Sequence, residues 1–364
     1  MPPLSRRDFL RVASTWASAL ILGEVLSACS EQTPALPAAE DPTQLPTTSP
    51  APDRATQLPT ISQPSATPQV ESITQTPPPE PTAAQPSWTA TPQPSPDLVV
   101  VRNGEPEELV RRALAALGGM EKFVPPGADV IVKPNICVGY LSYEYAATTN
   151  PWVVGTLVKL CYAAGARRVR VMDHTWRREM AEGYVTSGIQ AEVEGAGGEM
   201  VIMPLEKFIP TEIPLGLDLK MMDLYDDILN AEVLINVPIA KHHQDARLTL
   251  GMKNLMGVMQ NRPIIHDNIG QRLADLNSRV RPTLNILDAV RMMTAHGPIS
   301  GYLGDVKQID TLIASTDVVA LDSYGATLFD MQPEDLDYVV AATAMGLGRS
   351  DLHNLRIEEI NLNA

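Results

Sequence analysis

The chain has 364 residues, of which 44% are hydrophobic and only 5% aromatic, a composition typical of a globular protein with an aliphatic core. Its formal net charge of −15 at pH 7 argues against a nucleic-acid partner, because binding to phosphate backbones requires a basic surface. Its three cysteines cannot form a disulfide framework and are one short of a four-thiolate site. We therefore expect no iron–sulfur cluster from this chain alone.

Residues 1–29 have the pattern of an export signal. Residues 5–11 read SRRDFLR, and a moderately apolar run follows them. The pair Arg6 and Arg7 resembles a twin-arginine signal, and the end of the run at Cys29 resembles a lipobox, in which the cysteine is acylated. We predict an exported protein, anchored by lipid at the outer face of the cytoplasmic membrane or in the cell envelope. An uncleaved membrane anchor with a chance cysteine is the alternative.

Residues 30–97 contain 17 of the 32 prolines, no glycine and few apolar side chains. A segment of this kind cannot bury enough apolar surface to fold. We predict a disordered Pro/Thr/Ser-rich linker, whose ends would lie roughly 45 Å apart if it behaves as a flexible coil. The linker would separate a folded domain, residues 98–364, from the membrane.

From Leu98 onward, short β-rich runs alternate with helical stretches. The predicted strands are 98–102, 129–133, 168–173, 199–203, 233–237, 283–287 and 308–314. The predicted helices are 106–117, 151–164, 269–279, 317–329 and 334–345. Runs that are apolar on both faces, such as 130–132 and 233–237, are typical of parallel strands covered by helices. The predicted fold is α/β, with a doubly wound, mostly parallel sheet flanked by helices.

Polar side chains follow several of the predicted strands. In an open α/β sheet, ligands bind beyond the carboxyl ends of the strands. We expect Lys133, Lys241 and Lys253 to face one cleft there and to bind a small anionic molecule, with Asp173 or Asp288 beside them. Three separate ion pairs with local acids are the alternative interpretation.

Further residues complete this predicted site. Asn135 and Asn254 would orient the ligand by hydrogen bonds, and Gly297 and Gly301 would let the backbone approach it closely. The segment Gly251–Gly257 could open or line a helix whose backbone N–H groups help to hold the anion, although it lacks the Walker spacing.

Acid–base and metal roles are also open to some of these side chains. Asp173, His242 or Asp288 would act as acid or base. His174, His242 and His243 could hold a metal ion, and surface or hydrogen-bonded histidines are the alternative. Because His242 and His243 are adjacent, they should point apart on regular structure and not chelate one ion together.

Several of these residues lie in segments that resemble the family called domain of unknown function 362. The resemblance extends from about residue 129 to residue 362, and its motifs lie at 132–135, 148–151, 236–243, 248–257, 288–290, 297–301 and 315–322. The family has no settled activity. Its members often carry an added ferredoxin-like module with iron–sulfur clusters, and this chain lacks the cysteine pattern for one.

Two functions agree with the sequence. The first is a lipid-anchored envelope protein whose α/β domain binds a small anionic ligand or a metal-bearing cofactor, with or without catalysis. The second is a non-catalytic lipoprotein that binds a solute or serves as a scaffold. A closed pocket with perturbed titrating groups would favour an enzyme, whereas an exposed apolar patch would favour a scaffold.

Overall fold

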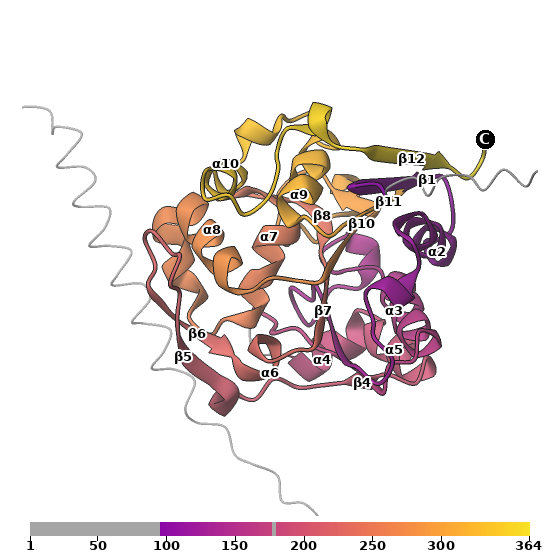
Figure 1. Cartoon of the computed structure of the whole chain (residues 1–364), viewed down its shortest axis with the longest axis horizontal. Coiled ribbons are helices and arrows are strands. Elements are labelled where there is room, and N and C mark those ends of the chain that lie inside the picture. Colours follow the sequence, from indigo (N-terminus) through magenta and orange to yellow (C-terminus); the bar gives the residue numbers. More distant parts are fainter. Residues whose placement is uncertain (1–94, 177–179) are drawn as a thin grey trace, which may run out of the picture. The chain divides into compact units, whose positions relative to one another are not determined.

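The fold was described from a computed structural model, in which residues 95–176 and 180–364 are placed (Figure 1). The export signal predicted at residues 1–29, and the linker up to residue 94, lie outside the described residues. Within the described residues, no helix is both long enough and apolar enough to cross a membrane.

A ten-stranded sheet forms the centre of the domain. Its strands are β1 (Leu98–Arg102), β2 (Asp129–Pro134), β3 (Arg168–Val171), β4 (Glu199–Met200), β7 (Val233–Val237), β8 (Ile239–His243), β9 (Arg247–Thr249), β10 (Leu284–Met293), β11 (Val306–Ser315) and β12 (Ile357–Asn361). The order is β12-β1-β11-β10-β7-β2-β3-β4, and β8 pairs with β10 and β9. Pairing is parallel except that β11 runs antiparallel to β1 and β10, and β9 to β8. The sheet is therefore mostly parallel, as predicted.

Helices cover both faces of this sheet (Figure 1). They are α2 (Pro106–Leu117), α3 (Pro151–Ala163), α4 (Met180–Thr186), α5 (Ile189–Gly195), α6 (Asp226–Leu229), α7 (Gly251–Asn254), α8 (Ile269–Arg279), α9 (Val318–Thr327) and α10 (Asp337–Ala344). Alternate residues of β1 enter different cores: Val99 and Val101 pack with α2, α3 and α5, whereas Leu98 and Val100 belong to the core formed with α7 to α10. Two cores on opposite faces of one sheet confirm the predicted α/β class.

Local sequence signals explain helix α3. Asn150 caps it, because its Oδ1 accepts a hydrogen bond from the backbone N–H of Trp152 at 3.0 Å, and Pro151 occupies the first turn. The chain leaves the helix through Gly165, whose φ of 94° favours glycine. Cys161 on this helix is fully buried, and burial raises the pKa of its thiol to about 12.

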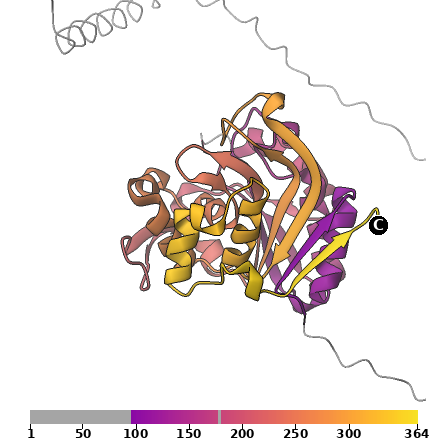
Figure 2. The same ribbon diagram turned by 90° about the horizontal axis from the view of Figure 1, so that it is seen from above.

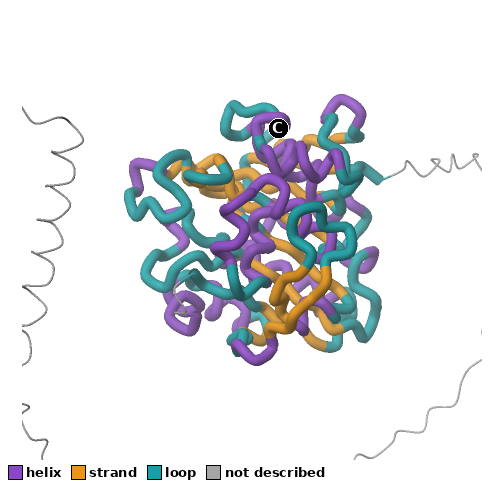
Figure 3. The backbone as a smooth tube through the Cα atoms, turned by 90° about the vertical axis from the view of Figure 1, so that its left-hand side faces the viewer, coloured by secondary structure: helices purple, strands orange, loops and turns teal. Residues whose placement is uncertain are grey.

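Other elements differ from the prediction. β10 runs on to Met293, past the predicted end at 287, and β8 follows β7 after the single residue Pro238. The edge strand β12 lies near the C-terminal end of the sequence, yet it pairs with the first described strand, β1, with Ile357 opposite Leu98 (Figure 2). A separate hairpin, β5 (Phe208–Glu212) with β6 (Met221–Tyr225), lies in a stretch with no predicted element. Figure 3 shows the loops that connect the strands and helices.

Candidate functional site

A cleft of about 610 Å³ opens beyond the carboxyl ends of β2 and β3. Its lining comes from the ends of β2 and β3, from β8 and β9 with the turn between them, and from α7 with the segment after it. Leu205, Pro298 and Ile299 complete it. Its lining includes the charged or hydrogen-bonding side chains of Asn135, Asp173, Lys241, His243, Lys253, Asn254 and Arg262. The cleft therefore lies beyond the carboxyl ends of the strands, where open α/β sheets bind their ligands.

Lys133, at the base of the cleft, forms an ion pair with Asp173 that compensates its positive charge. Its side chain is 1% exposed, and its Nζ lies 2.8 Å from Asp173 Oδ1, 3.0 Å from the carbonyl oxygen of Pro134 and 3.3 Å from Asn254 Oδ1. Burial lowers the pKa of Lys133, and the carboxylate of Asp173 opposes that shift. Asp173 also accepts a hydrogen bond from the backbone N–H of Ile136 at 2.7 Å. This pair adds no net charge to the cleft.

Lys241 has no carboxylate partner among the described residues, and burial lowers the pKa of its amine. It is also 1% exposed, and it donates to Asn135 Oδ1 at 2.9 Å and to the carbonyl oxygen of Ala147 at 2.7 Å. Asn135 Nδ2 donates in turn to Asn254 Oδ1 at 2.9 Å, so one chain of side chains joins Lys241 to the acceptor used by Lys133. The two lysines therefore lie on one connected network.

Lys253 has the fewest partners of the three lysines. It is 7% exposed and lines the cleft, and Met256 Sδ, at 3.3 Å, is the one hydrogen-bond acceptor of its Nζ within the described part of the chain. No described carboxylate lies within 4.0 Å of it. Burial lowers the pKa of Lys253 to about 8, and the neighbouring charges of Lys241 and Arg262 contribute to that shift.

Arg262 is a further cation in the cleft, and no pattern in the sequence predicts its role. It lies at the start of a 3-10 turn, Arg262–Asn268. Its guanidinium contacts the ring Nδ1 and the backbone oxygen of His174. Among the described lining residues Asp173 and Asp245 are the two acids, and Asp173 is paired with Lys133, so the basic side chains of Lys241, Lys253 and Arg262 outnumber the one remaining acid.

The histidines differ in where they point. On strand β8, Lys241 and His243 face the cleft, whereas His242 between them accepts a hydrogen bond at Nδ1 from the backbone N–H of Gly297 at 3.1 Å. The two adjacent histidines therefore point apart, as their spacing predicts. His174 lines the cleft near Arg262, so His174, His242 and His243 do not converge on one point.

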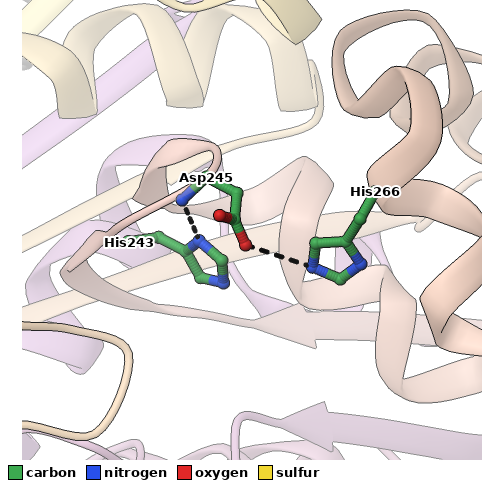
Figure 4. A group of neighbouring side chains, drawn as sticks. All are labelled: His243, Asp245 and His266. Atoms are coloured by element: carbon green, nitrogen blue, oxygen red, sulfur yellow. Dashed lines mark hydrogen bonds and ion pairs between the residues drawn. The ribbon is translucent and has the colours of Figure 1, made fainter. Parts of the chain in front are cut away.

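A different group has the composition of a metal site. His243, Asp245 and His266 offer ligand atoms that lie within 4.8 Å of one another (Figure 4). However, His243 Nδ1 accepts hydrogen bonds from the backbone N–H groups of Asp245 at 3.1 Å and Ala246 at 3.3 Å. Burial and the nearby lysines lower the pKa of His243 to about 2, so the ring is neutral and its one proton is on Nε2.

This tautomer leaves His243 without a free lone pair for a metal ion. The nearby cations Lys241 and Lys253 also oppose a divalent cation. The group therefore fits a metal ion poorly. A protonated Nε2 is instead a hydrogen-bond donor, which suits an oxyanion.

Five predicted residues do not line the cleft, namely Lys133 and His242, described above, and Asp288, Gly297 and Gly301. Asp288 is fully buried and accepts hydrogen bonds from the backbone N–H groups of Asn150 at 2.7 Å and Val290 at 3.0 Å, and burial raises its pKa to about 6. Gly297 and Gly301 flank the lining residues Pro298 and Ile299 without being part of the lining. A Cβ on Gly297 would lie 1.9 Å from the backbone oxygen of His242, so this glycine serves packing between two backbone segments.

Helix α7 begins at Gly251, but its N-terminus has a partner within the chain. The backbone N–H groups of Gly251 and Met252 donate to the carboxyl of Asp322 at 2.6 and 2.9 Å. They are therefore not available for a bound anion, contrary to the expectation for Gly251–Gly257. The other glycine of this segment, Gly257, has a separate role, because a Cβ there would lie 2.0 Å from Asp173 Oδ1 and 2.6 Å from Lys133 Nζ.

A model of the family described as "Domain of unknown function (DUF362)" matches residues 130–327, more than half of the chain. The chain belongs to this family. All the residues that line the cleft, from Asn135 to Ile299, fall within the matched DUF362 region.

Individual proteins are also similar to this DUF362 chain. It is 26% identical over 252 residues to the thylakoid-associated protein sll1697 of Synechocystis, an alignment that covers 65% of this chain and 74% of that protein. Among solved structures it is similar to the lactate racemase apoprotein from Thermoanaerobacterium thermosaccharolyticum, with 13% identity and a TM-score of 0.37 over 63% of this chain and 56% of the other. A protein from Thermotoga maritima matches with 10% identity and a TM-score of 0.35 over 67% and 60%. The chain thus spans less than two thirds of either solved structure, and at these TM-scores neither carries an argument about ligand or reaction.

Proposed function

We propose that the DUF362 domain of this chain binds a small anionic molecule in the cleft, as part of an exported protein that is anchored by lipid at Cys29. The observation that carries the binding proposal is the environment of Lys253. Its ammonium lies at the wall of a cleft with a thioether as its one described hydrogen-bond acceptor. A buried ammonium without an oxygen partner is costly, and a carboxylate, phosphate or sulfate oxygen would remove that cost.

The neighbours of Lys253 support the same ligand chemistry. Arg262 adds a positive charge, and the amine of Lys241 and the neutral ring of His243 add N–H donors. Asp173 is held by Lys133 and by Ile136, so it balances the base of the cleft and does not repel an anion at the wall. Binding without catalysis, as in a solute receptor, needs no more than these contacts.

The test of binding uses the full chain in detergent, with its thermal unfolding followed in sulfate, phosphate and citrate. At least one of these anions should raise the midpoint at a fixed ionic strength. The variant Lys253→Met should bind that anion about tenfold to a hundredfold more weakly, since a hydrogen bond to a charged group contributes about 1.5–3 kcal/mol. The matched control is Lys159→Met, because Lys159 is an exposed surface lysine paired with Glu107. Equal anion effects in both variants would refute an anion site at Lys253.

The export part of the proposal rests on the motifs at residues 5–11 and at Cys29. Changing Arg6 and Arg7 together to lysine should abolish delivery to the envelope, as measured by cell fractionation. Cys29→Ala should release the domain from membranes if acylation is the anchor. Unchanged delivery, or firm membrane retention of the alanine variant, would contradict the respective step.

A further inference from the structure

Lys253 differs from the other two buried lysines in a way that bears on covalent chemistry. Lys133 and Lys241 each donate to at least two oxygen atoms, which hold their ammonium groups in place. The Nζ of Lys253 has one hydrogen-bond acceptor among the described residues, the sulfur atom Met256 Sδ. Thioethers are weak acceptors, so this amine has little to keep it charged and little to keep it from reacting.

The backbone that carries Lys253 is firmly held. Helix α7 is attached at its start to Asp322, and Asn277 Nδ2 donates to the carbonyl oxygen of Met252 at 3.1 Å. The side chain lies at the cleft wall, whereas Lys133 lies behind the lining. The backbone position from which Lys253 reaches the cleft is therefore fixed.

A buried amine next to other cations can be neutral near physiological pH and then acts as a nucleophile towards carbonyl carbon. The shift of the Lys253 pKa to about 8 agrees with the geometry. Lys241 and Arg262 supply the neighbouring cations and would also hold an acidic group on the same ligand.

We propose that Lys253 forms an imine with an aldehyde or ketone that also carries a carboxylate or phosphate. This inference rests on the proposed anion site, because the acidic group places the carbonyl beside the amine. The amine nitrogen adds to the carbonyl carbon and the π electrons move to oxygen, which takes up a proton. The oxygen then leaves as water, the nitrogen loses its two protons, and a C=N bond forms. No oxidant or reductant is consumed, and the imine would activate the neighbouring carbon for acid–base chemistry.

The experiment uses pyridoxal 5′-phosphate as a probe with both an aldehyde and a phosphate, and pyridoxal as a matched probe without the phosphate. The full chain in detergent is incubated with each probe and reduced with borohydride, and the labelled peptides are identified by mass spectrometry. We expect Lys253 to be labelled at least tenfold faster than the exposed Lys159, and the phosphate probe to react faster than pyridoxal. Preferential labelling should disappear in Lys253→Arg, which keeps the positive charge.

The outcomes separate the imine from the anion site. If sulfate or phosphate stabilises the protein but label enters Lys253 no faster than Lys159, the imine inference is wrong and the anion site stands. If Lys253 is labelled rapidly and equally by both probes, and no anion stabilises the protein, the amine is reactive but the proposed anion site is wrong. Anion binding by Lys253→Arg together with loss of its label supports both.

Discussion

The base of the cleft and its wall differ in the partners that they provide for buried basic side chains. At the base, Lys133 lies 2.8 Å from Asp173 and its remaining contacts are oxygen atoms. At the wall, Lys253 contacts the sulfur of Met256, and Arg262 contacts the ring and backbone of His174. The base is complete without a ligand, whereas the wall gains most from an anion. The ion pair at the base therefore stabilises the fold, whereas the cations at the wall are suited to binding a ligand.

The largest effect should come from breaking the pair at the base. Asp173→Asn leaves Lys133 buried without its counter-charge, so we expect a loss of about 3–5 kcal/mol in the free energy of unfolding, measured in urea. The double variant Lys133→Met/Asp173→Asn, which removes both charges and keeps an oxygen acceptor for the Ile136 N–H, should recover most of that loss. A single variant as stable as the natural chain would show that the pair does not hold the base together.

A smaller effect should follow from crowding the same pair. Gly257→Ala places a Cβ 2.0 Å from Asp173 Oδ1, so the ion pair or the backbone must move. We expect a loss of about 1–3 kcal/mol, typical of overpacking, in the same urea measurement. Gly195→Ala is the control, because nothing lies within 4 Å of a Cβ there. Equal stability of the two variants would show that the segment can shift without cost.

The smallest expected effect is the change in anion affinity with pH that Lys253 causes at the wall. The pKa of Lys253 is lowered to about 8, so this amine is charged below that pH and neutral above it. The affinity for sulfate, whose own charge is constant over this range, should therefore fall as the pH rises through 8, by on the order of tenfold if one charged hydrogen bond is lost. In Lys253→Arg the affinity should stay level between pH 7 and 9. A natural chain whose affinity is equally level would mean that Lys253 does not contact the anion.

The central strands and long helices were predictable because their signals are local. Strand Val233–Val237 is apolar at four of its five positions, and the start of helix Pro151–Ala163 is indicated by an asparagine cap and a proline. The edge strand Ile357–Asn361 was missed, since its pairing with β1 depends on contacts far away in the chain. Strand β8 was missed because Pro238 reads as the end of the preceding strand.

The same distinction applies to the site. Lys133, Asn135 and Asp173 could be found because they lie at or just after the ends of predicted strands, and the sheet brings such positions together. Arg262 could not be found, because only the folded chain places its 3-10 turn opposite His174. Asp288 also follows a predicted strand, yet its carboxyl binds backbone N–H groups inside the domain. A polar residue at a strand end can thus serve the ligand or the backbone, and its sequence position does not distinguish the two.

The asparagine contacts behind the cleft form a series with one direction. Asn135 turns its oxygen to Lys241 and its amide nitrogen to Asn254, and Asn254 turns its own nitrogen to Asn236 at 2.8 Å. Asn236 repeats the arrangement towards Asn285 at 3.0 Å. The amide dipoles therefore point head to tail, with their negative ends towards the lysines, and each bond polarises the next. One amide cannot rotate unless its neighbours rotate as well, so the ammonium of Lys241 sets the orientation of a polar chain that extends across the sheet.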